Sequence, residues 1–579
     1  MAPAAVEAVE LERTAVKPVR RSRAVDLTAL GEPYLWTLGG ALAFGCLMIV
    51  GFLALVLWNG MVTFWPKPIA VVTMDDGTRI AGEPVRDELY RPGPDQLAKL
   101  TPAQRQEIQA ANGFGERTLY RIGNYDLYGD DFRWVSTYQR SAIATPADLM
   151  LFERLEWGVF IGTVKAVAID GQRRDRAQVT DAVFHEAHAV ARERLKKLHA
   201  IERGQIGAIN HTLDAERLKL RRVELSDGKD SAAYAAAQQA LEARQAELGR
   251  RYDALAADAK ALKDRDLRDT VTLADIDGKE KEIPLSALVR FYAANDLGIL
   301  DKLAIYGARW WEFVSDEPRE ANTEGGVMPA IFGTFALTLL LVVVVAPFGV
   351  ITALYLREYA KQGRMVAVVR ISVNNLAGVP SIVYGVFGLG FFAYLVGGTI
   401  DSVFFPERLP SPTFGTGGLL WSSLTLALLT VPVVIVATEE ALAAVPRSMR
   451  EGSLACGASK WQTIQRIVLP RAMPGILTGI ILAMARGAGE VAPLMLVGVV
   501  KLAPELPIDG YFPFVHLERS FMHLGFHIYD VGFQSRNSEA GKPMVFVTTL
   551  LLIGLVFVMN IGAIMIRNRL KRRFAGSQF

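Results

Sequence analysis

The sequence predicts an α-helical membrane protein with six transmembrane helices and a large α+β insertion outside the membrane. Three observations carry this prediction: apolar segments long enough to cross a bilayer, basic residues gathered in alternate loops, and one long segment of soluble composition between the first two apolar segments. Hydrophobic residues make up 51% of the chain and charged residues 21%. So many charges do not fit a chain made only of membrane helices, which favours a mixed chain.

A helix needs about 20 apolar residues to cross a bilayer, and six segments meet this requirement. They are residues 35–58, 327–356, 371–400, 419–438, 472–500 and 543–566, of which the fifth carries Arg486 and Glu490 inside it. Buried helices of a soluble protein are the alternative, but their apolar runs are usually shorter and interrupted by charges. The long basic segment before the first run does not fit a cleavable signal peptide. Residues 34–62 are therefore expected to be a retained anchor.

Basic residues predict the orientation, because short cytoplasmic loops carry an excess of Lys and Arg. The N-terminal tail, residues 1–33, holds the cluster Lys17, Arg20, Arg21 and Arg23. Alternation places three more basic segments on the same side, namely residues 357–370, residues 447–471 and the C-terminal tail 571–579. Both termini are therefore predicted to be cytoplasmic, and residues 63–325 to form an extracytoplasmic domain.

The insertion has signals for both strands and long helices. Residues 70–74 and 271–273 read as strands that enter Asp-Gly turns. Between about 180 and 264 proline is absent and helix-favouring residues dominate, with Leu241, Leu248, Leu255 and Leu262 at a coiled-coil period of seven. The turn at residues 226–230 splits this region into an antiparallel helical hairpin. We interpret the hairpin as a spacer or a docking arm.

Several chemistries are not expected. A formal net charge of +3 gives no basic face for nucleic acid. Cys46 and Cys456 are too few for a disulfide framework or a cysteine-based metal site. The pair His185 and His188 lacks further ligands, and no metal site or cofactor is predicted. His523 and His527, among aromatic residues, are expected on an amphipathic helix that lies on the membrane.

One cytoplasmic loop carries a recognisable motif. Residues 450–470 read REGSLACGASKWQTIQRIVLP, which closely resembles the EAA loop of ABC importer permeases. The matching positions are Glu451, Gly457, Ile467, Leu469 and Pro470, and the departure is Gly452-Ser453 where the family usually has Ala-Ala. The resemblance implies an ABC importer permease fold for residues 326–570, with five transmembrane helices and a coupling loop at 447–470. An ordinary basic loop would have to produce five matches at fixed spacing by chance.

The chain contains no Gly-x-x-x-x-Gly-Lys-Ser/Thr phosphate loop. By the resemblance, a separate ATPase subunit hydrolyses ATP and drives this subunit through the coupling loop. Gly457 permits the backbone to turn within the loop. Pro470 marks the restart of a membrane helix. No catalytic residue is expected, and the chain is predicted not to be an enzyme.

Two further segments narrow the family. Residues 376–385 (LAGVPSIVYG) and 485–494 (ARGAGEVAPL) are similar to the phosphate permease family PstA, here in a long form with a large insertion. The resemblance implies inorganic phosphate as the substrate and the bacterial inner membrane as the location. It also implies three partners: a PstC-like second permease subunit, a PstB-like ATPase subunit and a PstS-like phosphate-binding protein.

Arg486 and Glu490 are candidates for the translocation path, because an intramembrane charge is costly and is a functional hypothesis by default. Their spacing of four predicts one helix face. In one reading Arg486 lines the path of the anion, and Glu490 holds the Arg486 side chain in place. In the other reading Arg486 and Glu490 form a structural ion pair. Pro380, with Gly378, interrupts the third span and predicts either a backbone opening at a cavity or a simple kink.

Two rival functions remain at the level of the sequence. The first is a permease for another oxyanion, such as molybdate, sulfate or a phosphonate, which share the loop. The second is a membrane receptor or scaffold, which needs neither a coupling loop nor an intramembrane Arg/Glu pair. Competition between anions in uptake assays separates the first rival, and co-purification with an ATPase separates the second.

Overall fold

The computed structural model describes residues 32–98, 100–535 and 538–575. The chain divides into two units, Met1–Trp58 and Asn59–Phe579. The first unit consists, in its described part, of most of helix α1 (Glu32–Val62). The basic cluster Lys17, Arg20, Arg21 and Arg23 and the end of the C-terminal tail lie outside the described residues.

Six helical segments among the described residues are long and apolar enough to cross a membrane. They are Tyr34–Val62, Met328–Tyr359, Ser381–Phe404, Leu419–Ala443, Lys460–Gly489 and Glu539–Arg572. The predicted number of spans is confirmed. Two of the predicted boundaries, those of the third and fifth spans, are wrong.

The third span begins ten residues later than predicted, at Ser381 in place of residue 371. Helix α10 (Arg364–Leu376) ends before Gly378, and Pro380 precedes the first residue of α11 (Ser381–Phe387). Proline disfavours a helical conformation at the residue before it, so α10 and α11 are separate helices. The span continues through η7 (Gly388–Gly397) and α12 (Gly398–Phe404).

The fifth span begins earlier and ends earlier than residues 472–500. It runs without a break from α15 (Lys460–Thr463) through η9 (Ile464–Val468) into α16 (Leu469–Gly489). Glu490 has φ −79° and ψ 133°, an extended conformation that ends the helix. The short helix α17 (Leu494–Val497) follows as a separate element. The apolar run 491–500 is therefore a packed loop and not part of the membrane helix.

Helix α13 (Leu419–Ala443) is the most buried of the six candidate spans. It packs against both α9 (Met328–Leu354) and α16. Glycine permits these close approaches: a Cβ at Gly349 would lie 2.6 Å from Val434 Cγ1, and one at Gly479 would lie 2.5 Å from Ala437 Cβ. The remaining helices of this part are η6 (Tyr355–Tyr359), α14 (Arg447–Ala455), α18 (Leu524–Tyr529), η10 (Asp530–Gln534) and α19 (Ser538–Ala575), with the short η8 (Pro406–Arg408).

Residues 63–325 contain two larger antiparallel sheets and a two-stranded pair of β12 (Pro318–Arg319) and β13 (Glu324–Gly325). The first has the order β4-β3-β2-β1-β5 and the second the order β10-β9-β7-β6-β11, with β8 paired to β7. The strands are β1 (Ala70–Met74), β2 (Arg79–Tyr90), β3 (Gly115–Arg121), β4 (Phe132–Ser136), β5 (Arg140–Ala144), β6 (Met150–Arg154), β7 (Val159–Ile169), β8 (Gln172–Asp175), β9 (Thr270–Ala274), β10 (Glu280–Pro284) and β11 (Leu288–Ala293). Gly77 and Gly278 have φ of 83° and 82°, as the two Asp-Gly turns require.

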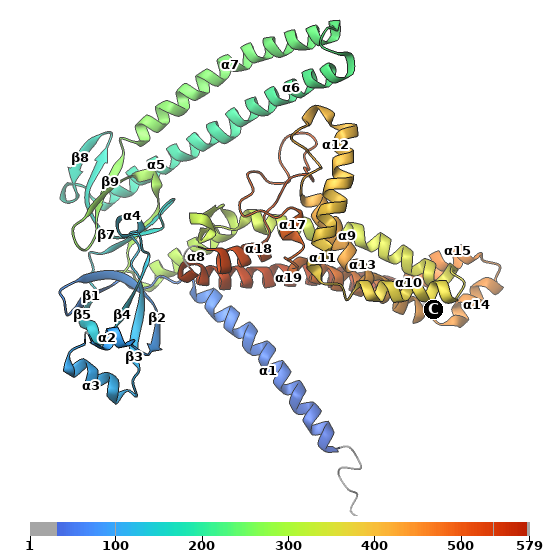
Figure 1. The fold of residues 1–579 in the computed structure, drawn as a ribbon, viewed down its shortest axis with the longest axis horizontal. Helices are drawn as coiled ribbons and strands as arrows, with labels where there is room; N and C mark the ends of the chain where they lie inside the picture. Colours follow the sequence, from blue (N-terminus) through green and yellow to red (C-terminus); the bar gives the residue numbers. More distant parts are fainter. Residues whose placement is uncertain (1–31, 99, 536–537, 576–579) are drawn as a thin grey trace, which may run out of the picture. The chain divides into compact units, whose positions relative to one another are not determined.

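A long helical pair interrupts the second sheet between β8 and β9. Helix α5 (Asp181–His199) continues through η3 (Ala200–Ile206) into α6 (Gly207–Asp227), and α7 (Ala232–Asp266) returns beside it (Figure 1). Gly228, with φ 81°, makes the turn, and Ser231 accepts a hydrogen bond from Tyr234 N at the start of α7. Leu241, Leu248 and Ala259 are the buried residues of α7.

His185 and His188 pack on the second sheet. The His185 ring stacks on Phe291 with centroids 4.7 Å apart, and His188 Nε2 lies 2.8 Å from the Leu288 carbonyl oxygen. Both histidines are therefore accounted for by contacts with β11. Smaller elements complete this part: α2 (Pro94–Ala98), α3 (Pro102–Ala110), α4 (Tyr125–Tyr128), α8 (Ile299–Ser315), β12 (Pro318–Arg319) and β13 (Glu324–Gly325).

Candidate functional site

The loop at residues 447–470 folds as a helix, a turn and a second helix. Helix α14 ends with hydrogen bonds from Cys456 N to Gly452 O and from Gly457 N to Leu454 O. Gly457 has φ 84°, the left-handed conformation that glycine adopts at little cost. Ser459 Oγ then accepts a hydrogen bond from Gln462 N at 3.2 Å, and Gln462 Oε1 accepts one from Ser459 N at 2.9 Å. This capping box starts the helix that becomes the fifth span.

Arg450 ties the loop to the helical core. Its guanidinium donates to Val445 O at 2.6 Å and to Leu442 O at 2.7 Å, at the end of α13. It also forms an ion pair with Glu358 in η6 at 3.0 Å. Hydrogen bonds from a charged donor are about twice as strong as neutral ones. The loop is thus fixed to the ends of two core helices.

The five motif residues occupy two different environments. Glu451 and Gly457 are exposed at the tip of the loop, whereas Ile467, Leu469 and Pro470 are partly buried in the helix that follows. The exposed apolar side chains Leu454 and Trp461 lie on the two helices of the tip. The first helix therefore offers a surface with both apolar and charged groups, and the second anchors it.

The role of Arg450 and Glu358 was not apparent from the sequence. Arg450 is one of several basic residues in the loop, and Glu358 lies 92 positions earlier, beyond the end of the second predicted span. A further link, between Ser453 Oγ and Thr463 Oγ1 at 2.9 Å, joins the two helices. The hydroxyl of Ser453 is supplied at a position where the family usually has alanine.

Arg486 and Glu490 lie together near the end of α16. Arg486 Nε is 3.6 Å from Glu490 Oε1, and the side chains keep 37% and 24% of their exposure. The sequence predicted that Arg486 and Glu490 share one helix face. This prediction is wrong, because the helix ends at Gly489 and Glu490 has an extended conformation. The pair is local to one segment of the chain.

The two segments that resemble phosphate permeases meet in the structure. Gly385 of α11 packs against Pro493, so closely that a Cβ at Gly385 would lie 2.8 Å from Pro493 Cα. Arg486 and Glu490 lie just before this contact in the chain. Pro380 is exposed at the start of α11. It therefore marks a boundary between two helices, so the simple kink within one span, one of the two alternatives given above, is not what the structure has at Pro380.

The prediction that His523 and His527 lie on a membrane-surface helix is wrong. These two residues are 0% and 2% exposed, and Leu524 and Gly525 of α18 are buried beside them. Two features bring this segment inside: Leu524 N donates to Thr334 Oγ1 at 2.9 Å, and Gly333 leaves room for the Met522 carbonyl, 2.0 Å from where a Cβ would stand.

A buried polar group also joins this segment to the insertion. Asn322 Nδ2 donates to Asp530 Oδ2 at 3.0 Å, and Lys501 Nζ lies 3.1 Å from the same atom. Asn322 follows Glu320 and Ala321, and all three residues have positive φ. No local pattern of charge or hydropathy pointed to this contact, because its members lie far apart in the sequence.

Comparison with known proteins finds relatives of the helical core. Residues 345–572 match the family described as binding-protein-dependent transport system inner membrane component. This segment holds the loop at 447–470, Arg486 and Glu490, and it excludes residues 63–325. The chain is 35% identical over 271 residues to the phosphate transport system permease protein PstA 1 of Mycobacterium tuberculosis (strain CDC 1551 / Oshkosh), which covers 47% of this chain and 80% of that protein.

Two other relatives match over shorter lengths. The probable ABC transporter permease protein YqgH of Bacillus subtilis (strain 168) is 34% identical over 216 residues, 36% of this chain and 65% of YqgH. The phosphate transport system permease protein PstA of Yersinia pestis is 38% identical over 183 residues, 32% of this chain and 56% of that protein. The chain thus spans a little under two thirds of YqgH and just over half of the Yersinia protein.

Proposed function

The chain belongs to the family of binding-protein-dependent transport system inner membrane components, and from that premise we propose that it is the permease subunit of an ATP-driven importer of inorganic phosphate. It forms half of the translocation pathway, and a PstC-like second permease forms the other half. The observation that carries the transport part is the loop at 447–470, an exposed helix tied by Arg450 to the core. The substrate part rests on the names of the PstA relatives.

The coupling loop connects this subunit to a PstB-like ATPase. Glu451, Gly457, Leu454 and Trp461 are exposed at the tip, where a partner groove can receive them. A displacement of this tip by the ATPase is transmitted to α13 and η6, because Arg450 contacts both. The tip also continues into the fifth span through Ile467, Leu469 and Pro470. Closure of the ATPase dimer thereby biases the pathway between two states.

Arg486 is our candidate for contact with the anion in the pathway. Its guanidinium keeps a third of its exposure and suits the geometry of a phosphate. Glu490 holds the guanidinium in place and limits how tightly an anion binds. Pro380 is assigned to the same path because its segment leads into the contact between Gly385 and Pro493. A purely structural ion pair is the alternative for Arg486 and Glu490.

We place the protein in the bacterial inner membrane with the tails 1–33 and 571–579 in the cytoplasm. The anchor 34–62 then leads to an extracytoplasmic domain, 63–325, and the permease core is 326–570. A PstS-like binding protein delivers phosphate on the outer side. The helical pair α6 and α7 acts as a coiled-coil docking arm: Arg222 forms an ion pair with Glu407, and His211 stacks on Tyr511 with centroids 4.2 Å apart.

Phosphate uptake tests the proposal in cells that lack their own importer and receive the matching partner subunits. Gly457→Val should abolish uptake and loosen the ATPase, because a β-branched residue does not tolerate φ 84°. Gly457→Asn is the matched control, since asparagine adopts this conformation, and it should retain uptake. Competition with molybdate, sulfate and phosphonate should leave phosphate uptake unchanged. Normal uptake by Gly457→Val would remove the coupling role and bring forward a receptor or scaffold.

A further inference from the structure

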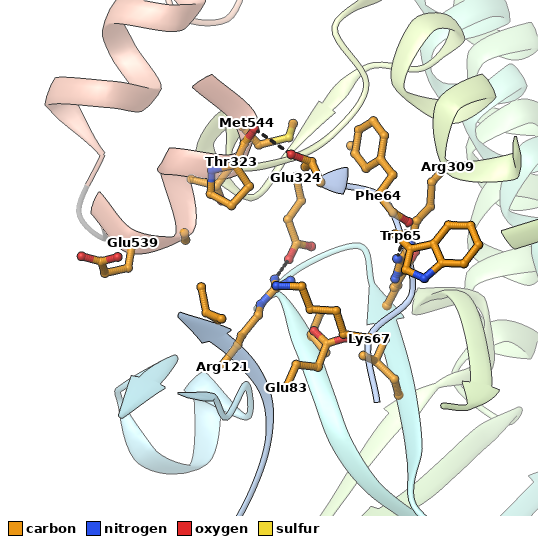
Figure 2. Close-up of a pocket in the computed structure, with 18 of the residues that line it drawn as sticks. Phe64, Trp65, Lys67, Glu83, Arg121, Arg309, Thr323, Glu324, Glu539 and Met544 are labelled. Carbon is orange, nitrogen blue, oxygen red and sulfur yellow. Dashed lines mark hydrogen bonds and ion pairs between the residues drawn. The ribbon is translucent and has the colours of Figure 1, made fainter. Parts of the chain in front are cut away.

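A cavity of about 180 Å³ lies at the foot of the insertion. Its walls come from the linker after α1, strands β2 and β3, helix α8 and the first turns of α19 (Figure 2). Its apolar part includes Phe64, Trp65, Pro543 and Met544. Its polar part includes acidic and basic side chains from the two larger sheets, from α8, from the β12-β13 pair and from α19.

Most of the charged groups in this wall neutralise one another. Arg309 pairs with Glu153 at 2.6 Å, Arg319 pairs with Glu312, and Arg121 pairs with Glu324. Lys67 and Glu83 are different. In the described part of the chain, neither forms an ion pair within 4.0 Å, and the Glu83 carboxylate has no hydrogen bond.

Glu83 is only 9% exposed. Lys67 Nζ donates to the Pro84 carbonyl at 3.3 Å. Burial raises the pKa of Glu83 and lowers the pKa of Lys67, and in each case this loss of solvent outweighs the opposite charges nearby. Figure 2 shows both side chains in the same part of the cavity, beside Arg121. A buried carboxylate with no hydrogen bond, next to a half-buried ammonium that has only a carbonyl partner, points to an absent occupant that carries both charges.

The position of the cavity indicates what this occupant is. Thr63 and Trp65 directly follow α1, and Met544 lies in the first turns of α19, so two helices that are long enough to span a membrane end here. Aromatic residues at such ends are typical of the membrane interface. If these two helices span the membrane, the cavity lies at the depth of the lipid headgroups.

Helix α8 supports the same placement independently. It lines the cavity through Arg309 and Glu312, while large apolar side chains elsewhere on the helix are exposed: Ile299, Leu300, Leu303 and Trp311. Tyr306 of this helix donates to the Met61 carbonyl at 3.0 Å, in the last turn of α1. An amphipathic helix joined to the end of a membrane helix is suited to lie in the interface, with its apolar side toward acyl chains.

We propose that this cavity binds a zwitterion with an ammonium and a phosphate a few bonds apart, supplied as the headgroup of a phospholipid of the phosphatidylethanolamine class. The ammonium lies against the Glu83 carboxylate. The phosphodiester lies between Lys67 and Arg121. The acyl chains extend along Phe64, Met544 and the apolar side of α8. Such a lipid fixes the insertion to the membrane at the point where the first and last spans emerge.

The test uses the full-length protein in nanodiscs and measures lipid retention by native mass spectrometry. Phosphatidylethanolamine should bind at least about tenfold more tightly than phosphatidylglycerol, which lacks the ammonium, or phosphatidylcholine, whose ammonium has no N–H donor. Glu83→Gln should remove the preference for phosphatidylethanolamine over phosphatidylglycerol. Lys67→Met should weaken both lipids, and the surface changes Lys165→Met and Glu116→Gln should alter neither.

Free phosphoethanolamine carries the same ammonium and phosphate as the lipid headgroup, so it tests whether the ligand is a membrane lipid or a soluble compound. It should fail to displace the lipid at equal concentration, since it makes no acyl contacts. Displacement of the lipid by free phosphoethanolamine would show that the ligand is not a membrane lipid. Equal retention of the three lipids, or unchanged retention in both Glu83→Gln and Lys67→Met, would overturn the site itself. Lys67→Met gives a second readout that does not depend on correct folding of the Glu83 variant.

Discussion

Arg486 and Glu490 lie 3.6 Å apart although Glu490 has left the helix that carries Arg486. The backbone becomes extended at Glu490, and the next residues pack against α11 through Gly385 and Pro493. The guanidinium is thus held by a carboxylate of its own segment. Neither partner is fully buried, and the Arg486 side chain keeps 37% of its exposure.

Arg486→Gln should therefore lower phosphate uptake strongly while the complex stays intact. Loss of a charged hydrogen-bond donor costs about 1.5–3 kcal/mol, which corresponds to about a tenfold to hundredfold loss of uptake rate. Arg486→Lys should keep part of the uptake because it keeps the charge. The exposed Arg466→Gln is the control and should transport normally. Normal uptake by Arg486→Gln would leave Arg486 with only a structural role.

Glu490→Gln should act in the opposite sense on binding. Without its carboxylate partner, the Arg486 guanidinium attracts the anion more strongly, so the KM for phosphate should fall together with the maximal rate of uptake. This pattern separates the path role from a structural role, because simple destabilisation lowers the rate and leaves KM unchanged. Uptake kinetics over a range of phosphate concentrations give both parameters.

Arg450→Met should weaken the coupling loop. The change removes two hydrogen bonds to carbonyls at the end of α13 and the ion pair with Glu358. The loss is about 2 kcal/mol for a charged donor with buried acceptors. We expect less ATPase retained on purification and slower uptake, with the exposed Arg447→Met as the control. Equal ATPase retention in the two variants would contradict this role of Arg450.

Two glycine variants should behave in opposite ways. Gly452 in α14 has open space where a Cβ would stand, so Gly452→Ala should stabilise the helix by about 1 kcal/mol and preserve uptake. Gly333→Ala places a Cβ 2.0 Å from the Met522 carbonyl and must displace the backbone, at a cost of ~1–3 kcal/mol. The midpoint of thermal unfolding in detergent should rise or stay level for the first and fall for the second.

Stability should decrease in acid because of two buried histidines. Burial lowers the pKa of both His523 and His527 to about 4, whereas the unfolded value is about 6.5. The unfolded chain binds more protons between these two values, so stability is complete above about pH 6.5 and falls as the pH drops toward 4. Each group contributes on the order of 3 kcal/mol across this window.

The His527→Phe variant tests this assignment. Neither ring nitrogen of His527 has a hydrogen-bond partner among the described residues, so phenylalanine breaks no bond and should leave the unfolding midpoint at pH 7.5 unchanged. The fall between pH 6.5 and 4.5 should become about half as steep, while exposed His199→Gln leaves it unchanged. The same steepness in His527→Phe and the parent would show that other groups control acid unfolding.

The helical core was predictable because its information is local. Long apolar runs gave six spans, the motif around Glu451 and Gly457 pointed to ABC importer permeases, and the family match to residues 345–572 confirms that resemblance. The end of the fifth span was missed because residues 491–500 are as apolar as a membrane helix. Pro493 and the extended backbone at Glu490 are the features that distinguish them.

The wrong and missing assignments share one cause, which is contact between distant parts of the chain. An amphipathic pattern at His523 and His527 predicts one covered face, and it does not say whether lipid or protein covers it. The neighbouring Met522 and Leu524 are held against protein: the Met522 carbonyl packs on Gly333, and Leu524 N donates to Thr334 Oγ1, 190 positions earlier. Lys67 and Glu83 likewise have no local pattern, and only the folded chain brings them to one cavity.

Cysteine labelling checks the predicted orientation of the insertion. Cys46 and Cys456 are both exposed, and Ser226 is exposed near the turn between α6 and α7. With Cys46 replaced by alanine, we compare a chain that keeps Cys456 with one that carries Cys456→Ala and Ser226→Cys. A membrane-impermeant maleimide added to spheroplasts should label Ser226→Cys at once and Cys456 only after permeabilisation, because the basic loops place residues 447–471 inside. The reverse pattern would invert the topology and place the coupling loop away from any cytoplasmic ATPase.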